Sequence, residues 1–173
     1  MKKVFFAAAL IGLTFAACSD DDDQQTNVSV EGNWKLTGFT LDEPVDFNQD
    51  GTATANLIGE TGCYTNSGIV FLGTGQAIVS LEGLDAELIV EGGTETVNID
   101  CLPADVFTGP YTVTENTVVL SGDLGDGEED VVMTRSGNTL SVYFPEVQDV
   151  PVEGTNGEVT YDLVGGTLTF TKQ

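Results

Sequence analysis

The sequence contains no histidine, and its five Lys and Arg residues stand against 28 Asp and Glu residues, so the formal net charge is −23. Without histidine the chain cannot form a Ser-His-Asp or Cys-His catalytic arrangement or a histidine-ligated zinc site. A field of this sign repels nucleic acid and anionic membrane surfaces. These absences exclude several enzyme classes, and we expect no nucleic-acid partner.

Other features of catalytic sites are also scarce. No glycine-rich loop is followed by a lysine that opens a helix, so a phosphate cradle is missing. Two carboxylates suffice for a glycoside hydrolase, but pairs arise by chance among so many acids, and Trp34 is the only tryptophan available for stacking on sugars. The sequence therefore predicts a protein that is not an enzyme and that uses no cofactor.

The N-terminal segment has the order of a secretory signal. Lys2 and Lys3 precede an uncharged run, Val4 to Ala17, which ends in small residues before Cys18. The run is too short for a stable membrane-spanning helix. We therefore predict that residues 1–17 are a signal peptide.

The four residues Phe15-Ala16-Ala17-Cys18 resemble the lipobox of bacterial lipoproteins. The resemblance implies that cleavage leaves Cys18 as a lipidated first residue, and that its several acyl chains hold the protein durably on a membrane. The alternative is ordinary secretion with an incidental cysteine.

Directly after this cysteine come Ser19, Asp20, Asp21, Asp22 and Asp23. They resemble the acidic export signal with which some Gram-negative bacteria place lipoproteins on the outer face of the outer membrane. Like charges also repel one another and keep a segment solvated, so the same residues suit a tether. We predict that residues 18–30 are a lipidated cysteine and an acidic tether, with outer-membrane lipid at the cell surface as their partner.

The other two cysteines, Cys63 and Cys101, are expected to form a disulfide, because paired thiols oxidise outside the cytoplasm. The loop-entropy relation gives such a bridge about 4 kcal/mol at most. A metal site built on the two thiols is disfavoured, because the chain offers no third soft ligand.

The rest of the chain, residues 31–173, shows two-residue alternation instead of a helical period, and glycine- or asparagine-containing turns separate the alternating runs. Many short strands with regular turns are typical of an antiparallel barrel or sandwich, so we predict a single all-β domain. Residues 122–130 and 145–154 are expected to be loops. The candidate strands lie near 32–40, 52–59, 67–73, 76–82, 86–91, 95–101, 109–115, 117–121, 129–135, 139–144, 158–163 and 167–172.

The motif Gly32-Asn33-Trp34 resembles the lipocalin signature at the start of the first strand. Together, Glu31 to Leu36, Asp46 to Gly51 and Thr61 to Tyr64 look like the lipocalin-like domain of bacterial surface lipoproteins. The resemblance implies an antiparallel up-and-down lipocalin-like β-barrel over residues 31–173, with Trp34 packed in one barrel end. The family also has an arginine that packs under this tryptophan, and by this resemblance Lys172 is the candidate to substitute for it.

One segment resembles half of a calcium loop. Asp46, Asn48 and Asp50, followed by Gly51, reproduce the pattern D-x-N-x-D-G, but Leu57 stands where a bidentate glutamate is required. We predict a turn that enters a hairpin, with calcium as the alternative.

These observations favour a lipid-anchored binding module at the cell surface for a small apolar or amphipathic ligand. The alternative is a non-enzymatic structural or interaction lipoprotein of a surface assembly, with a filled barrel. The residues expected to face the interior are Leu36, Val113, Val118, Leu120, Val131, Leu140, Val142, Phe144 and Phe170.

Overall fold

The computed structural model describes residues 29–123, 128–153 and 158–173. The predicted signal peptide, Cys18 and the acidic residues 19–23 lie outside these ranges. The described elements are β1 (Gly32–Val45), β2 (Thr54–Asn56), α1 (Leu57–Thr61), β3 (Gly68–Phe71), β4 (Gln76–Glu91), β5 (Thr94–Thr114), β6 (Thr117–Asp123), β7 (Glu128–Ser136), β8 (Thr139–Glu153) and β9 (Val159–Lys172).

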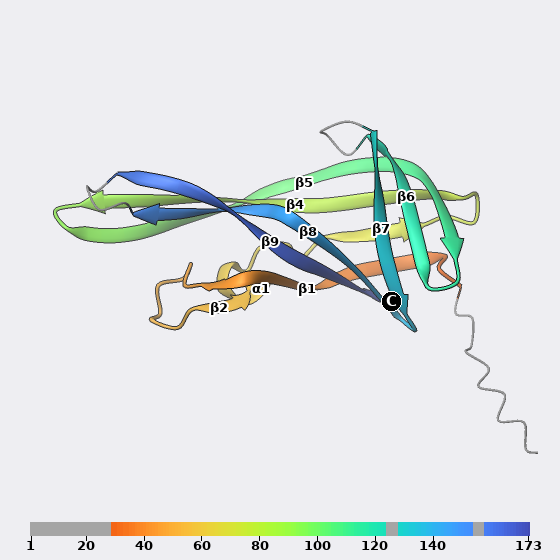
Figure 1. Ribbon diagram of the computed structural model, residues 1–173, viewed down its shortest axis with the longest axis horizontal. Helices are drawn as coiled ribbons and strands as arrows, with labels where there is room; N and C mark the ends of the chain where they lie inside the picture. Colours follow the sequence, from red (N-terminus) through yellow and green to blue (C-terminus); the bar gives the residue numbers. More distant parts are fainter. Residues whose placement is uncertain (1–28, 124–127, 154–157) are drawn as a thin grey trace, which may run out of the picture.

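The strands form an antiparallel sheet in the order β2-β1-β3-β4-β5-β6-β7-β8-β9, and a further pairing of β1 with β9 closes it (Figure 1). β2 pairs with β1 and lies outside the closed ring. The other eight strands, β1 and β3 to β9, pair in the order in which they follow one another in the chain, so they form an up-and-down barrel. This confirms the predicted all-β, antiparallel class and is consistent with a lipocalin-like fold.

Closure depends on β1, which pairs on both sides. Trp34 is the register partner of Ile69 in β3 and of Lys172 in β9. Gly68 lies so close to β1 that a β-carbon added there would be 2.5 Å from the carbonyl oxygen of Trp34. A side chain at this position would therefore push β3 away from β1.

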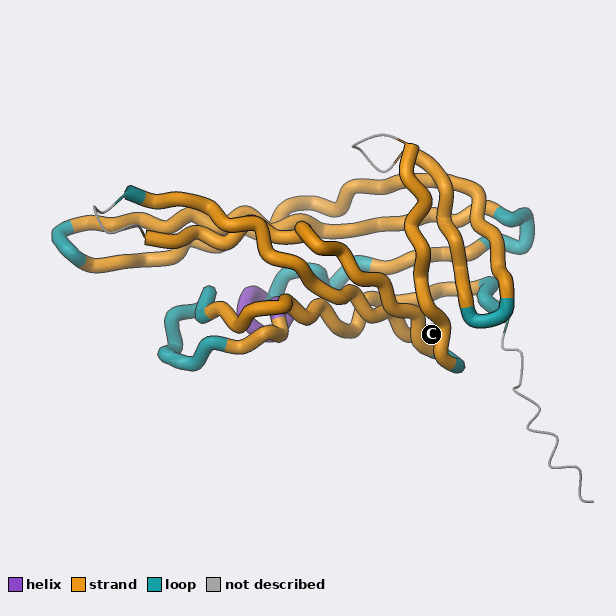
Figure 2. Tube along the Cα trace, in the orientation of Figure 1, coloured by secondary structure: helices purple, strands orange, loops and turns teal. Residues whose placement is uncertain are grey.

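Two long pairs of strands continue past the barrel and form an arm, which we define as residues 83–102 of β4–β5, and 148–153 and 158–164 of β8–β9, together with β2 and α1 (Figure 2). The register of each pair shifts where it leaves the barrel, between Leu81 and Gly83 in β4 and between Phe144 and Gln148 in β8. These shifts redirect the strands without ending them. The molecule is therefore elongated, with the barrel at one end and the arm at the other.

The arm is held together by a disulfide and by buried apolar side chains. Cys63, just after α1, is bonded to Cys101 of β5, with 5.4 Å between the two Cα atoms and 38 residues between them in sequence. This confirms the predicted bridge. Leu57, Ala86 and Val150 of the arm are buried in the same apolar cluster as the barrel interior, so the barrel and the arm share one continuous core.

Three local predictions were wrong in whole or in part. The expected strand at 52–59 is split into β2 and α1, because Asn56 caps the helix by accepting a hydrogen bond from the N–H of Gly59, and Gly62 ends it in a left-handed conformation (φ 71°). The expected loop at 145–154 is mostly the outer half of β8, which runs to Glu153. The other expected loop, 122–130, was too long, because β6 runs to Asp123 and β7 begins at Glu128; residues 124–127 lie outside the described residues.

Candidate functional site

The barrel interior holds an apolar cavity of about 460 Å³. This volume falls within the range of roughly 300–1,000 Å³ that is usual for small-molecule sites. Side chains from seven strands, β3 to β9, surround it, and the segment 145–147 of β8 contributes to one side. The described lining residues are Ile69, Val79, Leu81, Phe107, Leu120, Val131, Met133, Val142, Phe144, Pro145, Glu146, Val147, Leu168 and Phe170.

One end of the barrel is closed by Trp34, whose side chain is 2% exposed. Its indole N–H donates a hydrogen bond to the carbonyl of Val30 (2.7 Å), and its ring meets Phe71 edge-on with 6.4 Å between ring centroids. Lys172 Nζ lies 5.8 Å from the centroid of the indole ring and also donates a hydrogen bond to the carbonyl of Ser29. The structure thus places Lys172 against the tryptophan, where the sequence suggested a substitute for arginine.

The barrel wall is weakest between β7 and β8. These strands pair only from Thr134–Ser136 to Thr139–Ser141 and then diverge, as Figure 1 shows. Beyond the last pair, Val131 of β7 and Phe144 of β8 line the cavity without a backbone ladder joining them. The cavity is therefore bounded on this side by side chains, which can move aside more easily than a hydrogen-bonded ladder.

A short irregular segment, residues 145–147, borders the same side of the cavity. It lies at the register shift between Phe144 and Gln148, where β8 turns into the arm. Glu146 of this segment is exposed and is the only ionisable side chain among the described lining residues. A bound molecule with a polar end would find its one charged neighbour here.

The sequence analysis missed Arg135, a buried residue of β7 that is 7% exposed. Val131, Met133 and Arg135 share one face of the strand, and that face is buried or half-buried while their neighbours at 132, 134 and 136 are exposed. The alternation alone could have placed Arg135 inside the barrel. Arg135 is not among the cavity-lining residues. Its strand partner Leu140 follows the turn that contains Asn138. The carbonyl of Asn138 accepts a hydrogen bond from the backbone N–H of Lys172, at the closed end. Arg135 therefore belongs to the closed end.

Among the interior residues expected from sequence, Val113 is the exception. It pairs with the fully buried Val118 but is 43% exposed, because it is the second-last residue of β5 and lies at the barrel rim. The sequence could not decide whether the barrel contains a cavity. An alternation pattern gives the direction of a side chain but not the space left between opposite walls.

The segment from Asp46 to Gly51 folds into a turn that its own polar side chains stabilise. The carboxylate of Asp46 accepts hydrogen bonds from the N–H groups of Asp50 (3.1 Å) and Gly51 (2.9 Å), and the side chain of Asn48 accepts another from Asp50 (2.9 Å). Across the described residues, no group of three or more Cys, Asp or Glu residues is placed to hold a metal ion. The turn forms here through side-chain hydrogen bonds to the backbone.

At the junction of barrel and arm lies a buried polar pair. The hydroxyl of Tyr64 donates to Gln148 Oε1 (3.1 Å), and the Tyr64 ring packs edge-on against Phe39 with 5.1 Å between centroids. Burial raises the pKa of Tyr64 to about 12, because the phenolate would be poorly solvated there. Nearby in sequence, Glu60 of α1 is 6% exposed and its Oε2 has no hydrogen-bond partner.

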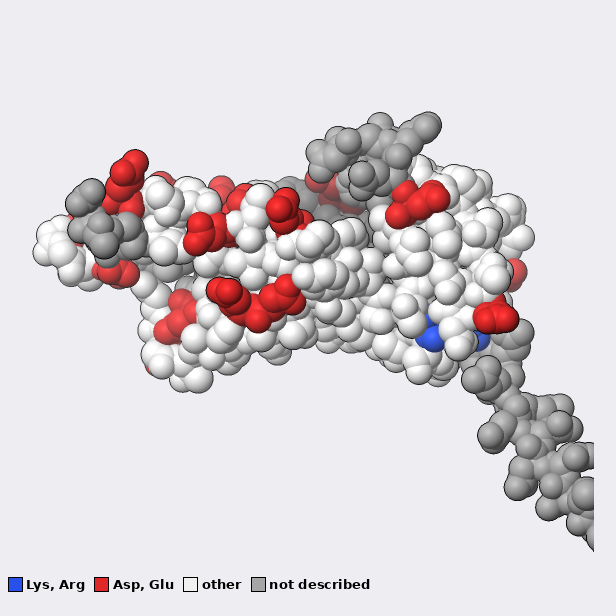
Figure 3. All heavy atoms as spheres, in the orientation of Figure 1, with Lys and Arg blue, Asp and Glu red and all other residues white. Residues whose placement is uncertain are grey.

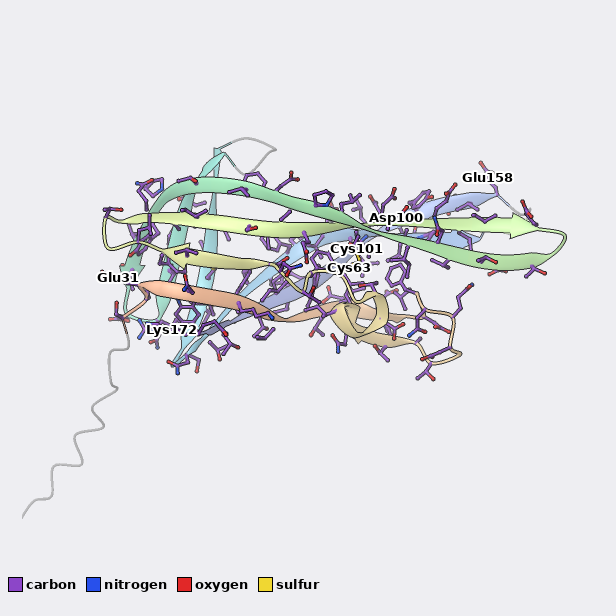
Figure 4. The ribbon with its side chains drawn as sticks, turned by 180° about the vertical axis from the view of Figure 1, so that it is seen from behind. Glu31, Cys63, Asp100, Cys101, Glu158 and Lys172 are labelled. Carbon is purple, nitrogen blue, oxygen red and sulfur yellow. A yellow bond between two sulfur atoms is a disulfide. The ribbon has the colours of Figure 1, made fainter. Side chains whose placement is uncertain are left out.

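Charge is distributed unevenly over the surface. In the face shown in Figure 3, acidic side chains form separate patches, more of them on the arm than on the barrel, whereas the few basic atoms lie at the closed barrel end. Figure 4 shows the molecule from behind, with Lys172 at that end, the disulfide near the middle and Glu158 toward the tip of the arm.

None of three comparisons with known proteins returned a match. The chain matched no protein family, no curated protein and no solved structure. Within the described residues, no helix has the length and apolar character needed to cross a membrane.

Proposed function

We propose that the protein is a lipid-anchored binding module at the bacterial cell surface, which holds a small apolar or amphipathic ligand in the barrel cavity. The observation that carries this proposal is the apolar cavity of about 460 Å³, closed at one end by Trp34 and bounded by side chains between β7 and β8. Transfer of apolar surface from water into such a cavity drives binding without any catalytic group.

The anchoring half of the proposal is supported by the sequence. The run before Cys18 and the acidic residues 19–23 match an export and lipidation pattern. The described chain begins at the closed barrel end, because Ser29 and Val30 are hydrogen-bonded to Lys172 and Trp34. A tether that leaves from there directs the closed end toward the membrane and leaves the cavity side and the arm exposed to the surroundings.

Ligand binding is tested with the mature chain carrying Cys18→Ser, so that no acyl group competes for the cavity. The neutral dye N-phenyl-1-naphthylamine, which fluoresces in apolar surroundings, serves as the probe. Val131→Trp places a large ring in the cavity, and Val132→Trp, at the neighbouring residue that is 56% exposed, is the matched control. We expect Val131→Trp to weaken dye binding by about tenfold or more, because the added ring occupies the volume, and Val132→Trp to leave it unchanged. Equal binding by both variants would contradict the proposed site.

Anchoring is tested in cells of a Gram-negative host. We expect the wild-type chain to sediment with outer membranes and to carry acyl groups on Cys18, as measured by the mass of its N-terminal peptide. Cys18→Ala should release it from the membrane fraction. Changing the four aspartates to asparagine should reduce its digestion by protease added to intact cells, if they direct surface display.

The alternative is a structural or interaction role in a surface assembly, and the arm is the feature that favours it. Tyr161 and Leu163 on the arm are 51% and 56% exposed, although both are large and apolar. Surface residues of this kind are enriched at protein interfaces. Co-purification of another protein from membranes, lost when Tyr161 and Leu163 are changed to serine, would support this role.

A further inference from the structure

The chemistry of the cavity and its mouth restricts the polar end of any ligand, and this inference rests on the binding function proposed above. Apart from Glu146, the described residues that line the cavity have no charged side chain. An ionised group buried without a partner of opposite sign is strongly disfavoured. The tail of the ligand must therefore be uncharged, and its head must lie at the mouth.

The mouth has a negative charge and no positive one to balance it. Glu146 is exposed within the irregular segment 145–147. The carboxylate of Asp42 is near the backbone of this segment but lies on the outer face of the wall. It accepts a hydrogen bond from Tyr143 (2.8 Å), which is 55% exposed, and neither residue lines the cavity.

The basic residues of the described chain are placed elsewhere. Lys35 and Lys172 are in the parts of β1 and β9 that pair at the closed end, and Arg135 lies near the turn at that end. None of the three lines the cavity. A carboxylate head at the mouth would therefore meet Glu146 with no cation beside it, whereas an ammonium head would be attracted by Glu146.

We propose that the cavity selects amphipathic molecules with a cationic or uncharged head and an apolar tail, and that it rejects those with a carboxylate head. Glu146 is the specificity-determining residue, because it is the ionisable group in direct contact with the cavity. The selection concerns the head alone, since the apolar lining treats identical tails alike.

Three probes with the same ten-carbon tail distinguish ligand binding in the cavity from selection of the head group. They are decanol, decylammonium and decanoate. Each is used below its micelle concentration to displace N-phenyl-1-naphthylamine from the mature chain at neutral pH. We expect decanol and decylammonium to displace the dye, and decanoate to require about tenfold or more higher concentration than decylammonium, as interactions at close range with partly exposed charges predict. Failure of all three to displace the dye would overturn the cavity as a ligand site and the head-group selection with it. Displacement by decanol with equal or better displacement by decanoate than by decylammonium would overturn the selection alone.

Variants then test the residue. Glu146→Gln should reduce the preference for decylammonium over decanoate several-fold, and Glu146→Lys should reverse it, while decanol binds all forms alike. Asp149→Asn is the matched control, because it removes one exposed negative charge from the same strand at a residue that does not line the cavity. If Asp149→Asn changes the preference as much as Glu146→Gln does, the effect comes from the overall charge of the protein, and the role of Glu146 is overturned.

Discussion

Lys172 Nζ lies 5.8 Å from the centroid of the Trp34 ring, and the two residues are also register partners across the seam between the last strand and the first. A cation above an indole face is attracted by the ring quadrupole. The contact therefore reinforces the pairing of β1 with β9 that closes the barrel. It lies at the closed barrel end, where the described chain begins.

Removal of the tryptophan should destabilise the barrel strongly. Trp34→Ala deletes a side chain that is 2% exposed together with its hydrogen bond to Val30, so we expect the free energy of unfolding to fall by about 3–5 kcal/mol. Guanidinium denaturation followed by circular dichroism measures it. Lys35→Ala, at the exposed neighbouring residue, should change stability by less than about 0.5 kcal/mol. A loss for Trp34→Ala as small as that of the control would show that the barrel end does not depend on this ring.

The disulfide should stabilise the fold by restricting the unfolded chain. Replacing both Cys63 and Cys101 by serine removes a bridge between residues 38 apart, for which we expect a loss of about 2–4 kcal/mol in urea denaturation. Reducing agent should lower the stability of the wild-type chain by a similar amount and leave the double variant unaffected. If reducing agent destabilised both equally, the effect would not be due to this bridge.

The buried tyrosine should make stability fall at high pH. The pKa of Tyr64 in the folded chain is about 12, above its ordinary value of 10.0. The unfolded chain therefore loses this proton first as the pH rises, and the stability that the neutral phenol provides is complete below pH 10 and is lost progressively up to about pH 12. Two pKa units correspond to about 2.7 kcal/mol.

Tyr64→Phe tests this dependence. We expect the variant to lose about 1–2 kcal/mol at neutral pH, because Gln148 Oε1 is left without its donor, and to show a flatter decline above pH 10. Tyr161→Phe, at a residue 51% exposed, is the control and should follow the wild-type curve. Parallel curves for all three proteins would rule out Tyr64 as the source of the decline.

The unpartnered carboxylate in α1 should cost stability. Glu60 is buried and its Oε2 accepts no hydrogen bond, so Glu60→Gln, which removes the charge and keeps the shape, should raise the free energy of unfolding by about 1 kcal/mol. Asp85→Asn, at an exposed residue of β4, should have no such effect. A clear loss of stability in Glu60→Gln would contradict a cost of the unpartnered side chain.

The sequence predicted the fold class and the disulfide because both follow from local signals. Alternation and turn residues mark antiparallel strands, and two cysteines outside the cytoplasm pair. The outer half of β8 was mistaken for a loop because it contains Pro145 and Pro151. Pro145 lies at the register shift of β8. Beyond this shift β8 is hydrogen-bonded only to β9, so its opposite edge needs no N–H donor. A proline such as Pro151 is therefore tolerated there.

The cavity and its mouth could not be predicted in the same way. They depend on where β7 and β8 stop pairing, which is a matter of register between strands and not of residue type. The sequence does not identify Glu146 as a site residue, because it is one acid among 28. Only its position beside the cavity distinguishes it. Arg135 was within reach of the alternation pattern, but an arginine is rarely expected inside a barrel.

Met133 offers the most direct test of the central claim, that the barrel holds a cavity which takes an apolar molecule. Its side chain lines the cavity and is 1% exposed, and Met1 is the only other methionine of the sequence. A mature chain labelled with ¹³C-methyl methionine therefore gives one methyl resonance, from inside the barrel. We predict that this resonance shifts on titration with decanol and saturates at one molecule per chain. An unchanged resonance at saturating decanol would contradict the account.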